Sequence, residues 1–222
     1  GKQRTIRLPD RSVLTLNTNS SVIVTYTNQQ RLIQMQRGEL HVEVAHDPSR
    51  PLSVYAAGNV IQAVGTAFNV YVEQDKVEVT VTDGTVLVAE QDAARRDPVH
   101  PKALSLPHTA LTLSQGQFSQ ITAEQPVIQT LAKEALTARV AWQQGKLVFN
   151  GETLAEAMSQ VSRYANVEFN IDDPSLAAVP VVGLFRNDDL RGVLFALEEN
   201  FNVKHTWLDN HTIELTAAMT RQ

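Results

Sequence analysis

The sequence predicts two domains: an all-β domain of many short strands, followed by a small α+β domain of two strand–helix–strand repeats. Apolar and polar residues alternate through residues 5–91, with turn residues every few positions, and this two-residue period is typical of half-buried strands. Residues 147–167 and 183–203 follow one pattern at an offset of 36. We expect the β domain to be a sandwich, a barrel or a solenoid-like stack. The expected boundaries are 1–130 for the β domain, 131–141 for a linker and 142–218 for the α+β domain.

Length and composition exclude several classes of protein. The 222 residues are enough for two domains with separate cores, and 43% hydrophobic with 19% charged residues is ordinary for a folded protein. The net charge is −5 with scattered Lys and Arg, whereas a nucleic-acid-binding domain usually has a concentrated basic face. The absence of cysteine excludes disulfides, thiolate metal sites and thiol nucleophiles. No apolar run reaches the roughly 20 residues of a membrane helix, and the sequence passes from Gly1 almost directly into a strand pattern at Thr5. We therefore expect an excised fragment, with any anchor or address outside this sequence.

The strands of the first domain are rich in β-branched residues. Asp83-Gly84 lies between alternating apolar residues and predicts a hairpin turn, because both central positions of such a turn need a positive φ. A proline-containing loop is expected at 92–109, and a helix-prone stretch at 131–136 leads to the second domain. The predicted strands are residues 13–16, 22–26, 40–44, 77–81, 110–113 and 117–121.

Each repeat of the second domain contains an amphipathic helix with a capping residue. Thr153 and Glu156 predict a capping box at the first helix, and Asp188 or Asp189 is expected to cap the second. The expected apolar faces are Leu154, Ala157, Met158 and Val161 in the first helix, and Leu190, Val193, Leu194 and Leu197 in the second. The expected strands are residues 167–171, 179–185, 203–208 and 212–215, with a hairpin turn at Asp209-Asn210.

Five ordered motifs in the first domain carry a family resemblance. They are residues 8–20, which read LPDRSVLTLNTNS, and residues 38–40, 50–54, 65–70 and 113–117. In this order they resemble the FecR family of iron-transport regulators. Members of that family more often have Gly where this chain has Arg11, so the turn after Asp10 is expected to differ.

The second domain also resembles a known module. From Trp142 to Phe149 the pattern is similar to the secretin/TonB short N-terminal domain, which FecR-type regulators have at their periplasmic C-terminus. The two resemblances imply the periplasmic region of a single-pass inner-membrane anti-sigma regulator. Its implied partners are the N-terminal signalling domain of a TonB-dependent siderophore transporter and, through a cytoplasmic segment absent here, an ECF sigma factor. Docking would report ferric-siderophore status.

No residue set in the sequence predicts catalysis, a metal site or a cofactor. GxSxG, P-loop and GxGxxG motifs are absent. Glu39 and Glu43 could be paired carboxylates on one strand face, but a solvated polar face is the expected role. None of the six histidines has a close metal-ligand spacing, and all six are expected at the surface. They are His41, His46, His100, His108, His205 and His211.

The second domain is the expected protein-binding surface. A sheet this small leaves edges with unpaired backbone groups, which invite strand addition by a partner. Phe149, Phe185 and Phe195 are expected to fill the core, whereas Trp207, near a strand end, is expected to keep one face exposed. The candidate contact residues are Val181, Val182, Leu184, Arg186, Lys204, His205, Trp207 and Leu208.

Two other functions remain open from the residues alone. Stacked β architectures often serve sugars, so a periplasmic carbohydrate-binding or carbohydrate-cleaving domain is one alternative, although aromatic residues are sparse and scattered in the first domain. The other is a secretin-type assembly domain that forms rings. Glycan binding by residues 1–125 would favour the first, and ring formation by the second domain would favour the other.

Overall fold

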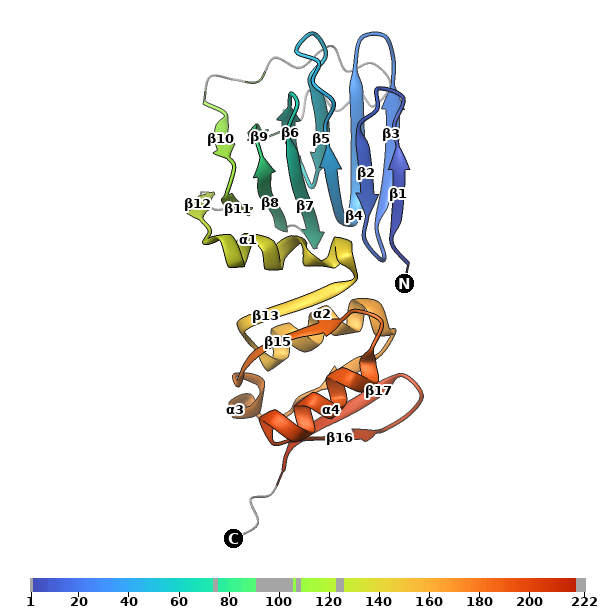
Figure 1. Cartoon of the computed structure of the whole chain (residues 1–222), viewed down its shortest axis with the longest axis vertical. Coiled ribbons are helices and arrows are strands. Elements are labelled where there is room, and N and C mark those ends of the chain that lie inside the picture. The colour runs from blue at the N-terminus through green and yellow to red at the C-terminus, as the bar shows by residue number, and fades with distance from the viewer. Residues whose placement is uncertain (1, 74–75, 91–105, 107–108, 123–125, 219–222) are drawn as a thin grey trace. The chain divides into compact units, whose positions relative to one another are not determined.

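The computed structural model describes residues 2–73, 76–90, 106, 109–122 and 126–218. The chain divides into two compact units, Gln3–Leu136 and a unit that begins at Thr137. Figure 1 shows the first unit as strands and the second as a mixture of helices and strands. Each unit is described by itself below.

The first unit is built on a single sheet of twelve strands, and the all-β prediction is confirmed. The main path of the sheet runs β10-β9-β6-β5-β4-β7-β8-β11-β12, while β1 pairs with β2, and both β2 and β3 pair with β4. The strands are β1 (Arg4–Arg7), β2 (Val13–Leu16), β3 (Ser21–Tyr26), β4 (Arg31–Glu43), β5 (Leu52–Ala56), β6 (Asn59–Ala63), β7 (Ala67–Glu73), β8 (Lys76–Asp83), β9 (Thr85–Glu90), β10 (Leu111–Ser114), β11 (Gln117–Ile121) and β12 (Val127–Thr130).

The twelve-stranded sheet of the first unit folds into two layers, and strand β4 belongs to both of them. Its first half pairs with β3 and β5, and its second half, from Gly38 onward, pairs with β2 and β7. Gly38 lies at the change of partners and has a φ of 89°. A Cβ at this position would approach the Cα of Ser20 to 2.5 Å, and positive φ is unfavourable for residues with a Cβ. Only glycine therefore fits where β4 passes between layers.

The core of the first unit is an apolar cluster enclosed by the two layers. Leu14, Leu40, Phe68, Val79 and Leu113 have no solvent exposure and belong to one contiguous cluster. Burial of each such side chain contributes about 1.5–3 kcal/mol. Residues 39–42 of β4 are all buried, so side chains on both faces of this stretch are shielded from solvent.

A short helical segment follows the sheet. The helix-prone stretch is confirmed as α1 (Lys133–Val140), which is followed by the 3-10 helix η2 (Ala141–Gln144). Gly145 ends η2 with a φ of 71°. Most of the predicted loop at 92–109, including His100 and His108, lies outside the described residues.

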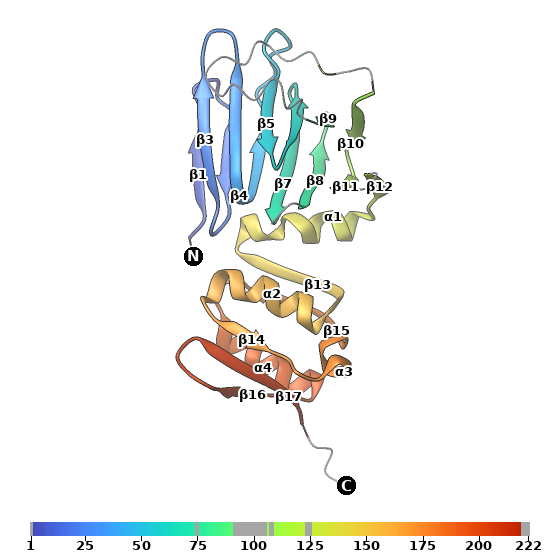
Figure 2. The ribbon, with the colours of Figure 1, turned by 180° about the vertical axis from the view of Figure 1, so that it is seen from behind.

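Among its described residues, the second unit has two small sheets and, after the end of α1 and η2, three α-helices. Strands β13 and β15 form an antiparallel pair, and the other sheet has the order β14-β17-β16 with β14 parallel to β17 (Figure 2). The predicted order of each repeat is confirmed as β13-α2-β14 and β15-α4-β16. The elements are β13 (Lys146–Thr153), α2 (Leu154–Ala165), β14 (Glu168–Asn170), α3 (Pro174–Ala177), β15 (Pro180–Arg186), α4 (Leu190–Phe201), β16 (Val203–Trp207) and β17 (Thr212–Ala217).

The repeated helices begin and end alike. Thr153 and Glu156 form the predicted capping box of α2. Asp189, 36 residues after Thr153, caps α4 by accepting a hydrogen bond from the Gly192 amide. Both helices end at an asparagine in the left-handed conformation, with φ of 54° at Asn166 and 56° at Asn202. Asparagine tolerates this conformation better than most residues, so the 36-residue offset reflects equivalent helix ends.

The two helices bury their predicted apolar faces in one core. Leu154, Ala157, Met158 and Val161 are buried on α2, and Val193, Leu194 and Leu197 are buried on α4. Leu190 is half-buried and packs against the same cluster. Phe149 is fully buried as expected, and its ring lies 5.9 Å from that of the half-buried Phe185.

Candidate protein-binding site

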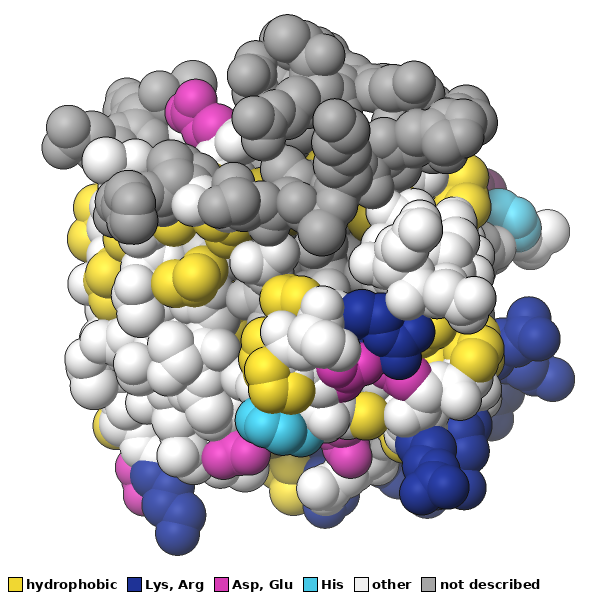
Figure 3. Space-filling model, turned by 90° about the horizontal axis from the view of Figure 1, so that it is seen from above, with side chains coloured by type: hydrophobic (Ala, Val, Ile, Leu, Met, Phe, Trp, Pro, Cys, Tyr) yellow, Lys and Arg dark blue, Asp and Glu magenta, His cyan; other side chains and the backbone are white. Residues whose placement is uncertain are grey.

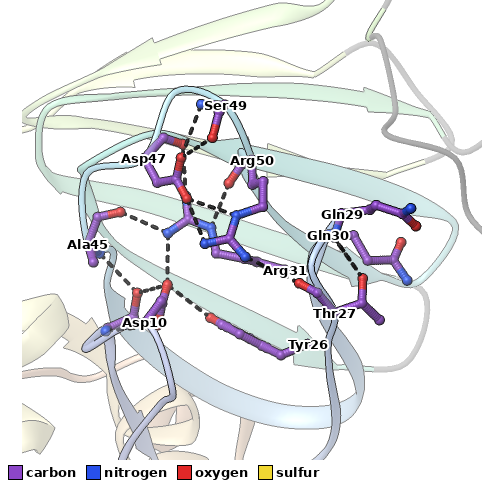
Figure 4. A network of polar contacts seen from close by, with 11 residues as sticks. Asp10, Tyr26, Thr27, Gln29, Gln30, Arg31, Ala45, Asp47, Ser49 and Arg50 are labelled. Atoms are coloured by element: carbon purple, nitrogen blue, oxygen red, sulfur yellow. Dashed lines mark hydrogen bonds and ion pairs between the residues drawn. The ribbon is translucent and has the colours of Figure 1, made fainter.

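A buried polar cluster of the first unit surrounds Arg31, at the start of β4. Its Nη1 donates to Asp10 Oδ2 at 2.7 Å and to the Ala45 carbonyl oxygen at 2.8 Å, and its Nε donates to the Arg50 carbonyl oxygen at 2.6 Å. Figure 4 shows Arg31 between Asp10 and residues 45–50. These bonds hold the turn after β1 against the loop before β5. The cluster therefore stabilises the fold by linking these two segments.

Electrostatics in this cluster favour the ionised carboxylate. Burial alone raises the pKa of Asp10, but hydrogen bonds from Ser12 and Arg31 outweigh it and hold the pKa below its ordinary value. Burial, together with the nearby Asp10 charge, raises the pKa of Tyr26, so its hydroxyl stays protonated. Opposite charges are adjacent on the outer surface as well: Figure 3 shows Lys or Arg side chains next to Asp or Glu side chains.

Two polar side chains of β4 are buried, contrary to the sequence prediction. His41 is 6% exposed and lies 3.2 Å from the Thr82 hydroxyl, and burial lowers its pKa to about 4. Glu39 is also 6% exposed and accepts hydrogen bonds from Asn17 at 2.8 Å and Asn69 at 3.0 Å. The predictions of a surface histidine and a solvated Glu39 are wrong because both faces of β4 are covered here. Glu43 alone is exposed as expected.

The remaining histidines are dispersed. His46 and His211 are exposed, and His205 is half-buried. Within the described ranges, no group of three or more His, Asp or Glu side chains could hold a metal ion. None of the helices in those ranges is both long and apolar enough to cross a bilayer.

The structure places the predicted contact residues on two outer strands of the second unit. Among the described strands, β15 pairs only with β13, and β16 pairs only with β17. Each therefore has one free edge. On β15, Val182 and Leu184 are 66% and 63% exposed, and Arg186 is exposed beside Asp188. Val181, the other predicted contact residue of β15, is 1% exposed, because alternate residues of β15 point into the core.

Strand β16 and the turn after it carry the other predicted residues. Trp207 is 46% exposed, which confirms that part of its surface reaches solvent, and the adjacent Leu208 is 52% exposed. Lys204 is exposed, and His205 Nδ1 lies 2.8 Å from Glu198 Oε1 on α4. The two side chains are close enough for an ion pair, but the angle at His205 Nδ1 does not fit a hydrogen bond.

An open depression of about 800 Å³ lies between α4 and β16. Phe195 lines it and is 64% exposed, so its predicted place in the core is wrong. The buried stripe of α4 is formed by Val193, Leu194 and Leu197, and Phe195 lies outside that stripe. The lining residues are Asp188, Asp189, Leu190, Arg191, Leu194, Phe195, Glu198, His205 and Trp207.

Comparison with known families agrees with this architecture. The profile of the family described as FecR protein matches residues 1–87, and the profile described as FecR, C-terminal matches residues 146–215. The chain belongs to the FecR family. It is thus a regulator of the FecR anti-sigma type. The FecR C-terminal match covers the two repeats; their relation to the secretin/TonB short N-terminal module stays a prediction.

Solved structures share the FecR-family fold seen here. Two crystal structures of a candidate anti-sigma factor from Parabacteroides distasonis ATCC 8503, at 1.65 and 2.50 Å, superpose with TM-scores of 0.76 and 0.74. Both are 22% identical over 98% of this chain, and the match covers 96% and 95% of their own chains. This similarity concerns the fold. Among curated proteins, no sequence matches this FecR chain.

Proposed function

We propose that this chain is the periplasmic signal-receiving region of a FecR-type regulator. Its partner is the N-terminal signalling domain of a TonB-dependent outer-membrane siderophore transporter. Docking reports that the transporter holds ferric siderophore, and a cytoplasmic segment of the regulator passes this state to an ECF sigma factor. Membership of the FecR family supports the regulatory part of the proposal.

The free edges of β15 and β16 carry the binding part of the proposal. An exposed strand edge offers a row of backbone donors and acceptors, which an extended segment of a partner can complete. Here both edges lie beside exposed apolar side chains, Val182 and Leu184 on β15 and Trp207 with Leu208 near the end of β16. Backbone pairing supplies affinity and the side chains supply selectivity. The proposal assigns no catalytic residue, cofactor or metal.

Isothermal titration calorimetry tests this proposal directly. The chain is titrated with purified signalling domains from several TonB-dependent transporters, and we expect selective binding of one or a few. Val182→Pro or Trp207→Ala should weaken that binding, provided that circular dichroism shows a folded variant. Glu168→Gln, on β14, is the matched control and should bind like the parent. If no signalling domain binds the parent chain, the proposed partner is wrong; glycan binding would favour the carbohydrate alternative instead.

A further inference from the structure

We infer that the depression between α4 and β16 binds an extended partner segment that carries a large apolar side chain next to Lys or Arg. This inference rests on the proposed function and specifies which edge docks and what chemistry the docking segment needs. Three independent features of the second unit support it: an exposed aromatic residue that the first repeat lacks, the charge of the lining, and the alternation of β16.

Phe195 is an exposed aromatic residue whose equivalent in the first repeat is small and polar. The 36-residue offset aligns Phe195 on α4 with Ser159 on α2, and both side chains are exposed. The same helix position is thus filled by a small polar residue in one copy and by phenylalanine in the other. Because an exposed Phe gains little from folding, its presence only on α4 indicates an interaction surface.

Trp207 is a second position at which the two repeats differ in exposure. Its equivalent is Ile171, which is half-buried and packs against the core of the unit. Trp207 instead keeps 46% of its surface exposed and lines the depression together with Phe195. Large aromatic side chains are the most frequent energetic centres of protein interfaces. The second repeat therefore differs from the first by two exposed aromatic residues on one surface.

The charge of the depression favours a cationic segment. Its lining has three carboxylates, Asp188, Asp189 and Glu198, and one guanidinium, Arg191. Asp188 is also paired with Arg186 outside the depression, at 2.9 Å, whereas Glu198 faces His205 at 2.8 Å. Lys and Arg are attracted by carboxylates and by the faces of Trp and Phe rings. The aromatic and acidic residues thus favour the same kind of side chain.

The free edge of β16 sets the conformation of the docking segment. His205 and Trp207 are two residues apart and both line the depression, as expected for one face of a strand. A segment that pairs with β16 presents every second side chain to that face. A segment of the form Lys-Thr-Leu-Thr-Lys would direct both lysines and the leucine toward the depression.

The first experiment uses a signalling domain that binds the parent chain. Phe195→Ser, which copies the residue of the first repeat, should weaken binding about tenfold or more, as expected for a central aromatic contact. The control is Ser159→Ala at the exposed equivalent position of α2, which should change the dissociation constant less than about twofold. Thermal unfolding checks that both variants fold. If Phe195→Ser binds within twofold of the parent, the inference fails while the proposed function stands.

The second experiment is independent of the transporter. The chain has two tryptophans, and Trp142 is buried whereas Trp207 is exposed, so iodide quenching of fluorescence reports mainly on Trp207. The peptide Lys-Thr-Leu-Thr-Lys should protect Trp207 from iodide, and Glu-Thr-Leu-Thr-Glu should not. Phe195→Ser should remove the protection. Equal protection by the two peptides, or none by the basic one, would overturn the inference even if a signalling domain binds elsewhere.

Discussion

Arg31 and Asp10 form an ion pair inside the first unit, with an Nη1–Oδ2 distance of 2.7 Å and side-chain exposures of 0% and 8%. A buried guanidinium that loses its carboxylate keeps the cost of desolvation without the compensating attraction. The pair therefore matters most when only one member is removed.

Asp10→Ala is expected to lower the free energy of unfolding by about 3 kcal/mol, because it leaves the Arg31 charge buried with carbonyl partners alone. Urea denaturation followed by circular dichroism measures the change. The control is Arg50→Ala, which breaks a more exposed pair with Asp47 and should have a much smaller effect. Equal losses in both variants would contradict this account of the cluster.

The buried His41 should make the first unit sensitive to mild acid. Burial lowers its folded pKa to about 4, below the ordinary 6.5, so between these values the unfolded chain takes up the proton more readily. The stability due to neutral His41 is complete above pH 6.5 and is lost as pH falls toward 4, by at most about 1.4 kcal/mol per pH unit.

His41→Gln is the matched variant for this pH dependence, since it has no titratable group at the site. Urea denaturation of parent and variant between pH 7 and pH 4 should show a steeper loss of stability in the parent. Parallel curves would show that His41 is not buried as a neutral group. Asp10, whose pKa is lowered in the folded state, also loses part of its stabilising effect at the acid end of this range, but it is present in both proteins and cancels in the comparison.

Arg11 has a φ of 75°, a conformation that favours glycine. The turn after Asp10 therefore takes a glycine-type form although the residue is arginine. Arg11→Gly is expected to stabilise the chain by about 0.5–1 kcal/mol, as relief of the left-handed strain exceeds the added flexibility of the unfolded chain. Arg11→Ala retains the strain and should give no gain. Thermal unfolding distinguishes the two, and an equal gain in both would argue against strain at this position.

The repeated caps predict matched losses in the second unit. Thr153→Ala and Asp189→Ala each remove a side-chain acceptor for a helix amide and should each cost about 1 kcal/mol. Asp188→Ala, one residue earlier, removes only an exposed contact with Arg186 and should leave unfolding nearly unchanged. Denaturant titration of the three variants tests the assignment; a larger loss for Asp188→Ala would mean that the cap is misplaced.

Features set by local sequence could be predicted well. The capping box of Thr153 and the apolar stripes of both helices depend on residues within a few positions of one another, and the structure confirms them. The choice between Asp188 and Asp189 was also contained in the repeat, because an offset of 36 aligns Asp189 with Thr153.

Features set by distant packing could not be predicted from the alternation pattern. His41 and Glu39 lie on a strand whose two faces are both covered, and alternation by itself does not reveal a second cover. The burial of Val181 and the exposure of Phe195 were hidden for a related reason: an apolar residue on a strand or helix does not show which face meets the core. The exposure of Phe195 could have been suspected from its serine equivalent in the first repeat.

The passage of β4 between layers at Gly38 also bears on how the first unit comes apart. Since one continuous backbone supplies hydrogen bonds to four neighbouring strands, detachment of β4 removes a partner from each layer simultaneously. We therefore expect no stable intermediate in which one layer is unfolded and the other is intact. A protease that cuts within residues 31–43 should thus release the entire unit to further digestion, rather than leave a trimmed but stable remnant.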